Sequence, residues 1–158
     1  GEVGREVTTR AKAMGMEILY YQRTRLPAEI EAESGARYVS YEELLEASDF
    51  ISVHLPLNAS TEGMIDAASF ARMKPGAIIA NISRAQIIDR DALIAALDSG
   101  RLGGAGLDVH YAEPGDPDEP LKNYRNVVLS PHVAVAQRSH NMADTAEMVA
   151  NLTAALRG

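Results

Sequence analysis

The sequence has 158 residues, 46% of them hydrophobic and 23% charged, which predicts one domain with a hydrophobic core. A formal net charge of -7 argues against nucleic acid and anionic membrane surfaces as partners, and no apolar run approaches the roughly 20 residues that span a bilayer. The absence of cysteine excludes disulfides, thiolate metal sites and cysteine nucleophiles, and it is typical of a cytoplasmic protein.

The chain opens on a glycine pair, Gly1 and Gly4, followed by a segment of helical composition over residues 5–16. This spacing matches the last two glycines of G-x-G-x-x-G, where the backbone approaches a pyrophosphate at a helix N-terminus. A plain helix-starting turn has the same two glycines, so the pair alone leaves both interpretations open. Because the first glycine, the strand before it and an initiator Met are missing, we expect a fragment of a longer chain.

Residues 16–21 form a predicted strand that ends at Gln22, Arg23, Thr24 and Arg25. In dinucleotide-binding folds an Asp or Glu at this point, about 20 residues beyond the glycines, binds the ribose 2′-hydroxyl of NAD. Gln22 removes that negative charge, and guanidinium groups bind phosphate well, so we expect NADP rather than NAD. The alternative is that Arg23 and Arg25 are solvated loop residues and that NAD is used.

Strands and helices then alternate along the chain. We expect a helix or loop over residues 26–35, an edge strand over 36–40, a helix over 41–49, a buried strand over 50–55, a loop and helix over 58–76, a buried strand over 77–83, and a helix over 89–102 capped by Asp89. This order predicts an α/β fold with a doubly wound, Rossmann-type parallel sheet, and residues 1–158 as one dinucleotide-binding domain. The acidic, proline-rich residues 112–121 are expected to be a loop, and residues 138–158 a last helix.

Two apolar runs, residues 107–109 and 127–130, are predicted strands whose downstream ends carry Asp108, Glu113 and His132. Ligands of parallel sheets bind outside the carboxyl ends of the strands, so these side chains should meet there. A carboxylate beside a histidine stabilises the imidazolium, which then serves as a general acid near neutral pH. The remaining histidines, His54, His110 and His140, are interpreted as structural or exposed, and no cluster has the spacing of a metal site.

Arg84 follows the apolar strand of residues 77–83. Its planar fork suits a substrate carboxylate, and its charge can polarise a neighbouring carbonyl. An ion pair with one of the many acids is the structural alternative. We favour the substrate role because Arg84, Glu113 and His132 all follow apolar strands in the same half of the chain.

Three blocks of the sequence, residues 48–65, 73–114 and 126–134, resemble in order and spacing the cofactor-binding domain of the D-isomer-specific 2-hydroxyacid dehydrogenases. The resemblance implies a catalytic set of Arg84, Glu113 and His132, in which His132 is the acid and base, Glu113 orients it and Arg84 binds a small 2-oxo acid. It also implies a homodimer, with residues 138–158 near the partner domain or subunit.

The same resemblance places cofactor contacts along the chain. They are Gly1, Glu2 and Val3 at the phosphates; Gln22, Arg23 and Arg25 at the adenosine ribose; Leu55, Pro56 and Thr61 on the adenine side; Ile82, Ser83 and Arg84 at the nicotinamide ribose; and Asp108, His132 and the residues after it, including Ala134 and Val135, at the nicotinamide. The resemblance therefore implies an oxidoreductase that transfers a hydride between NAD(P) and a 2-oxo or D-2-hydroxy acid. A nucleotide-gated interaction module without turnover, as in corepressors of the family, is the alternative. Among enzymes, formate or phosphite oxidation is the second possibility, and formate is disfavoured because Glu113, not Gln, pairs with His132.

Overall fold

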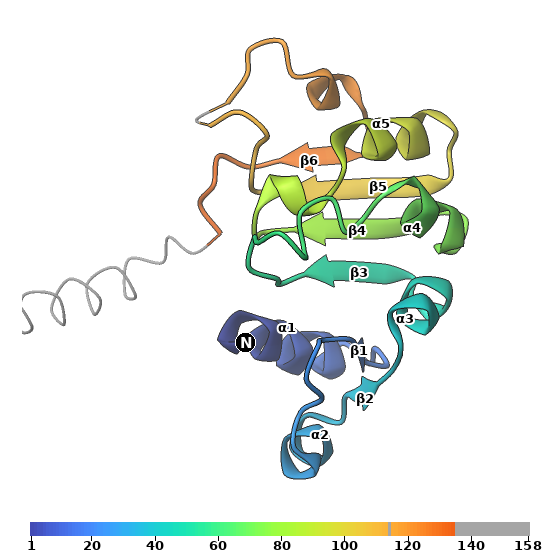
Figure 1. Ribbon diagram of the computed structural model, residues 1–158, viewed down its shortest axis with the longest axis vertical. Coiled ribbons are helices and arrows are strands. Elements are labelled where there is room, and N and C mark those ends of the chain that lie inside the picture. Colours follow the sequence, from blue (N-terminus) through green and yellow to red (C-terminus); the bar gives the residue numbers. More distant parts are fainter. Residues whose placement is uncertain (114, 135–158) are drawn as a thin grey trace, which may run out of the picture.

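Parallel strands form two sheets in the computed structural model, which describes residues 1–113 and 115–134 (Figure 1). The larger sheet has the order β3 (Phe50–Val53), β4 (Ala77–Asn81), β5 (Leu102–Leu107) and β6 (Val127–Leu129). A smaller sheet pairs β1 (Leu19–Tyr20) with β2 (Arg37–Tyr38). Every described pairing is parallel, which confirms the predicted α/β class.

Helices connect these strands as the alternation predicted. They are α1 (Glu2–Ala13), α2 (Ala28–Ser34), α3 (Tyr41–Ala47), α4 (Ala67–Arg72), α5 (Arg90–Asp98) and the short 3-10 helices η1 (Ala85–Ile87) and η2 (Pro120–Asn123). Asp89 caps α5, as predicted, by accepting a hydrogen bond from the backbone N–H of Ala92 at 2.8 Å. Ser40 and Asp66 cap α3 and α4 in the same way. The helix expected over residues 138–158 and His140 lie outside the described residues.

The hydrophobic core lies on the side of the larger sheet that α4 and α5 cover (Figure 1). Burial alternates along the strands, because successive side chains point to opposite faces of a sheet. Ile79 of β4 and Leu93 of α5 are fully buried in this core. On the opposite face, Phe50, Ile78 and Val128 remain 59%, 38% and 70% exposed.

Strand β5 lies earlier in the sequence than predicted. The apolar run of residues 107–109 was expected to be the strand, with helix up to residue 102, but the helix ends at Asp98 and β5 spans Leu102–Leu107. Glycines are usually disfavoured in strands, so the glycine-rich residues 102–107 do not look like a strand in the sequence. Here they are required, since a Cβ on Gly103 would lie 2.2 Å from the carbonyl oxygen of Gly76, and one on Gly104 would lie 2.7 Å from that of Asn126.

The acidic segment between β5 and β6 has more structure than the loop that was expected. It contains η2, in which Leu121 is 2% exposed and packs into the core. Glu119 is also buried, and it pairs with Arg90 at the start of α5 at 3.1 Å. This segment is thus anchored to the domain at both an apolar and an ionic contact.

Candidate active site

The predicted site residues lie on segments that leave the carboxyl ends of the strands. Figure 1 shows the arrowheads of β3 to β6 on the left, the same side as the start of α1. Arg84 follows β4, Asp108 and Glu113 follow β5, and His132 follows β6. Because β4, β5 and β6 are neighbours in the sheet, their downstream segments are neighbours as well.

Glu113 and His132 are in direct contact. The Nδ1 atom of His132 lies 3.0 Å from Oε1 of Glu113, and the two side chains are 38% and 44% exposed, respectively. Nδ1 is therefore engaged with the carboxylate, which leaves Nε2 as the ring nitrogen available to a ligand. The arrangement can exchange a proton with a bound molecule while the carboxylate stabilises the charged ring.

The carboxylate of Glu113 is kept ionised by its neighbours. The backbone N–H of His110 donates to Oε1 at 3.1 Å. That bond is the main cause that lowers the pKa of Glu113 from its ordinary value of 4.5, and the contact with His132 lowers the pKa further. The negative charge beside His132 is accordingly present throughout the neutral pH range.

Asp108 binds residues on both sides of His132. It is 3% exposed and accepts hydrogen bonds from the Ser130 hydroxyl at 2.5 Å and from the N–H groups of Val133 and Ala134 at 2.9 and 2.7 Å. Burial would raise the pKa of Asp108, but these hydrogen bonds outweigh it and lower the pKa below 3.8. Asp108 thus acts on the loop that carries His132.

The backbone of His132 itself adopts an unusual conformation. Its φ is 56°, and it is the one residue other than glycine with a positive φ in the part of the chain that the structure describes. Its N–H donates to the carbonyl of Ser130 at 3.0 Å, which closes a tight turn. Such conformations are costly for a residue with a side chain and are characteristic of functional sites.

Arg84 lies in a loop that the buried Asn81 organises. Asn81 ends β4 with no exposed surface; its side chain donates to the carbonyl of Arg84 and accepts from the N–H of Ser83, both at 2.9 Å. The Asn81 carbonyl also accepts from the N–H of Asp108 at 3.0 Å, which joins this loop to the end of β5. The exposed Arg84 guanidinium donates to the Ser83 carbonyl and makes no ion pair within the described residues.

His110, interpreted from the sequence as structural or exposed, belongs to this network. Its Nε2 lies 2.9 Å from the carbonyl oxygen of Ser130, so this nitrogen is the donor, and its backbone N–H binds Glu113. His110 therefore connects the partner of His132 with the turn that precedes it. The sequence carries one signal for this role, since His110 lies between Asp108 and Glu113.

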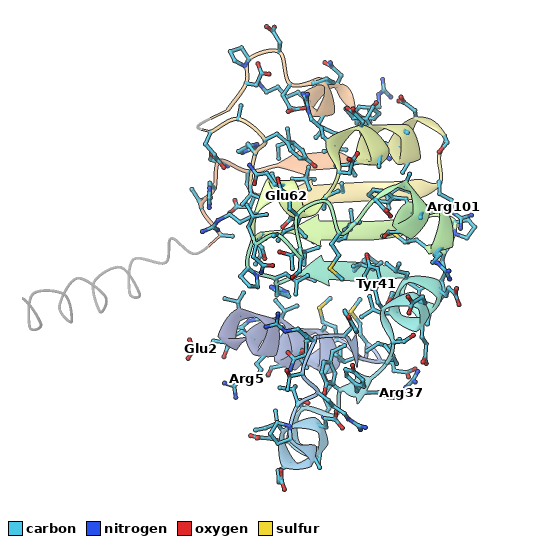
Figure 2. The ribbon with its side chains drawn as sticks, viewed as in Figure 1. Glu2, Arg5, Arg37, Tyr41, Glu62 and Arg101 are labelled. Atoms are coloured by element: carbon cyan, nitrogen blue, oxygen red, sulfur yellow. The ribbon has the colours of Figure 1, made fainter. Side chains whose placement is uncertain are left out.

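The start of α1 fits an anionic group. Gly1 is the N-cap of the helix. The first-turn N–H groups of a helix have no partner within the helix and can bind a phosphate. Figure 2 shows Glu2 and Arg5 extending outward from this end of α1, and Val3 is also exposed.

Gly4 lies where α1 approaches the end of β3, since its Cβ position would be 3.7 Å from the ring of His54. His54 contacts Ser52 through Nε2 at 2.8 Å, and burial lowers the pKa of His54 from 6.5. The structural interpretation of His54 agrees with this environment.

Further predicted cofactor segments follow β1, β3 and β4. Gln22 and the exposed Arg23 lie in the loop after β1, whereas Arg25 of the same loop is paired with Glu31 of α2. After β3, Leu55 is half-buried and Pro56 is exposed, and the buried Thr61 donates to the Pro56 carbonyl at 2.6 Å. The half-buried Ile82 and Ser83 lie after β4, where the Ser83 hydroxyl donates to the Val53 carbonyl of β3. Ala134 reaches Asp108, and Val135 lies outside the described residues.

Residues 1–113 and 115–134 contain no group of three or more His, Asp or Glu side chains that could bind a metal ion. No helix in that part of the chain has the length and apolar composition needed to cross a membrane.

Comparison with known proteins finds relatives over the whole length of the chain. The family model described as "D-isomer specific 2-hydroxyacid dehydrogenase, NAD binding domain" matches residues 1–134. A glyoxylate reductase of Korarchaeum cryptofilum is 48% identical over 159 residues, covering 100% of this chain and 47% of the relative. The 4-methyl-2-oxopentanoate reductase A of Aspergillus oryzae is 48% identical over 133 residues, covering 84% of this chain and 40% of the relative.

Among solved structures, a glyoxylate reductase from Paecilomyes thermophila superposes with a TM-score of 0.90 and is 41% identical. The superposition covers 98% of this chain and 46% of that one. The chain thus spans about half the length of the curated relatives that it matches.

Proposed function

We propose, since this chain belongs to the D-isomer-specific 2-hydroxyacid dehydrogenase family, that residues 1–158 are the dinucleotide-binding domain of a longer oxidoreductase. Its reaction transfers a hydride between a nicotinamide cofactor and the C2 carbonyl of a small 2-oxo acid. The observation that carries this proposal is the 3.0 Å contact between His132 and Glu113 beside the carboxyl end of the sheet.

Each catalytic side chain has a distinct role in the proposed reaction. The bound nicotinamide supplies the hydride that reduces C2 of the substrate. His132, protonated and oriented by Glu113, donates the proton from Nε2 to the carbonyl oxygen, and in the reverse direction it accepts that proton. Arg84 binds the substrate carboxylate with its guanidinium fork and polarises the carbonyl.

Cofactor binding is assigned to the segments at the carboxyl ends of the strands. Gly1, Glu2 and Val3 provide the phosphate turn, and the loops after β3, β4, β5 and β6 line the adenine and nicotinamide sides. We propose NADP as the preferred cofactor, because Gln22 carries no negative charge and no ion pair of Arg23 occurs within the described residues. We also propose, from the family resemblance and the cysteine-free sequence, a homodimer in the cytoplasm.

The decisive experiment follows nicotinamide absorbance when the complete protein is incubated with NADPH or NADH and with glyoxylate, hydroxypyruvate or pyruvate. Oxidation of the cofactor that depends on the 2-oxo acid supports the enzyme. Tight cofactor binding without turnover would instead identify an interaction module.

The Arg23→Ala variant should weaken NADPH affinity about tenfold and leave NADH affinity nearly unchanged, because only NADPH loses a charge-assisted contact.

Substitution of His110 tests whether it positions the catalytic pair. The His110→Phe variant should lower kcat about tenfold with little change in KM, since the hydrogen bond to Ser130 is lost while a similar ring volume remains. His110→Gln can donate an amide N–H to the same carbonyl and should recover part of the rate. Wild-type kcat and an unchanged pH profile of kcat in His110→Phe would show that His110 has no positioning role.

A further inference from the structure

We propose that Glu31 is a specificity-determining residue, which pairs with Arg25 and thereby withholds its guanidinium from the 2′-phosphate of NADP. The inference rests on the proposed function, in which the loop after β1 receives the adenosine ribose. It predicts that Glu31 limits the preference for NADP that Gln22 and Arg23 create.

The pairing of Arg25 and Glu31 is bidentate. Arg25 Nε lies 2.8 Å from Oε1 of Glu31, and Arg25 Nη2 lies 2.7 Å from Oε2. These are the two parallel N–H bonds that the same guanidinium would direct at a phosphate. Arg25 therefore cannot bind a 2′-phosphate in this way without giving up Glu31.

Glu31 is fixed in place by more than Arg25. Its side chain is only 14% exposed, and the Tyr20 hydroxyl donates to Oε1 at 2.5 Å while accepting from the N–H of Leu26 at 2.9 Å. The Arg25 guanidinium lies 5.5 Å from the centre of the Tyr38 ring, within the range of a cation–π contact. Strand β1, strand β2 and helix α2 thus all contribute to the orientation of the pair.

The charge of Glu31 persists over the pH range in which such enzymes are assayed. Hydrogen bonds from Arg25, first, and from Tyr20 lower the pKa of Glu31 to about 2. A 2′-phosphate in this loop would face the guanidinium of Arg23, which makes no ion pair within residues 1–113 and 115–134, and that of Arg25, which a carboxylate neutralises. The carboxylate would in addition repel the phosphate.

Adenosine 2′,5′-bisphosphate and 5′-AMP isolate the contribution of the 2′-phosphate without any turnover. Their dissociation constants would be measured by titration calorimetry on the complete protein, together with those of NADPH and NADH. Glu31→Gln removes the charge and retains an acceptor for the Tyr20 hydroxyl. We expect it to tighten the bisphosphate and NADPH about tenfold and to leave 5′-AMP and NADH within about twofold.

Two controls distinguish the effect of freeing Arg25 from the effect of removing a negative charge anywhere on α2. Glu29→Gln removes an equal charge from an exposed position of α2, and it should change bisphosphate affinity less than about twofold. Arg25→Ala alone should weaken bisphosphate binding at most about threefold, through the uncovered charge of Glu31, because the Arg25 guanidinium is already occupied. Combined with Glu31→Gln, it should cancel the gain.

Several results would overturn the inference. They are an unchanged bisphosphate affinity in Glu31→Gln, an equal gain in Glu29→Gln, a gain that survives in the double variant, and a large loss in Arg25→Ala alone. The last result needs no Glu31 variant, so the inference can fail even if Glu31→Gln does not fold. If wild-type protein binds none of the four ligands, the proposed function fails together with the inference.

Discussion

Replacing His132 by Ala is expected to lower kcat of the complete enzyme about 10²- to 10⁴-fold, the range that loss of a positioned general acid produces. Cofactor affinity should stay within about twofold, because the proton donor contributes to the transition state rather than to binding of the dinucleotide. The measurement is kcat at saturating 2-oxo acid, paired with a cofactor titration. The 3.0 Å contact with Glu113 is the structural reason that His132 can carry the proton.

A second substitution at this position guards against a purely structural explanation. His132 has a φ of 56°, a region that Asn tolerates better than most residues, so His132→Asn preserves the backbone and removes the acid. Both variants should lose rate to a similar extent. Turnover near the wild-type level in either variant would disprove the role assigned to His132.

Replacing Arg84 by Ala is expected to raise KM for the 2-oxo acid about 10²-fold, with a smaller decrease in kcat. The variant removes the bidentate, charged hydrogen-bond donor of the substrate carboxylate, which loses its hydration when the substrate binds. Arg84→Lys retains the charge without the fork and should give an intermediate KM. Initial rates over a range of substrate concentrations separate KM from kcat.

The matched control is Arg125→Ala, which removes an exposed arginine just before β6, at the amino end of the sheet and away from the candidate site. Its KM should equal that of the wild type. If Arg84→Ala kept a wild-type KM, or if Arg125→Ala raised KM equally, the substrate contact would not belong to Arg84.

The meeting of Glu113 and His132 could be predicted because it depends on topology. Both residues follow apolar strands, and parallel neighbouring strands deliver their downstream ends to one edge. The alternation of strands and helices was predictable for the same reason, since it depends on runs of apolar residues and on caps such as Asp89.

The supporting contacts could not be predicted in this way. Asn81 acts through a buried amide, which looks in sequence like any polar residue at the end of a strand. Arg25 and Glu31 pair across the boundary between a loop and a helix, where no fixed spacing brings side chains together. The position of strand β5 was predicted wrongly because its glycines are required by a tertiary contact, the close approach of Gly76 to Gly103, which the sequence does not reveal.

The left-handed backbone of His132 has a thermodynamic consequence for the whole domain. A residue with a side chain in this region costs about 1–2 kcal/mol, and the hydrogen bonds that the Asp108 carboxylate accepts from the N–H groups of Val133 and Ala134 offset that cost. The domain thus gives up folding stability at the position of the proposed general acid. Variants selected for thermal stability alone should therefore accumulate glycine or asparagine at residue 132, and these variants should be more stable and less active.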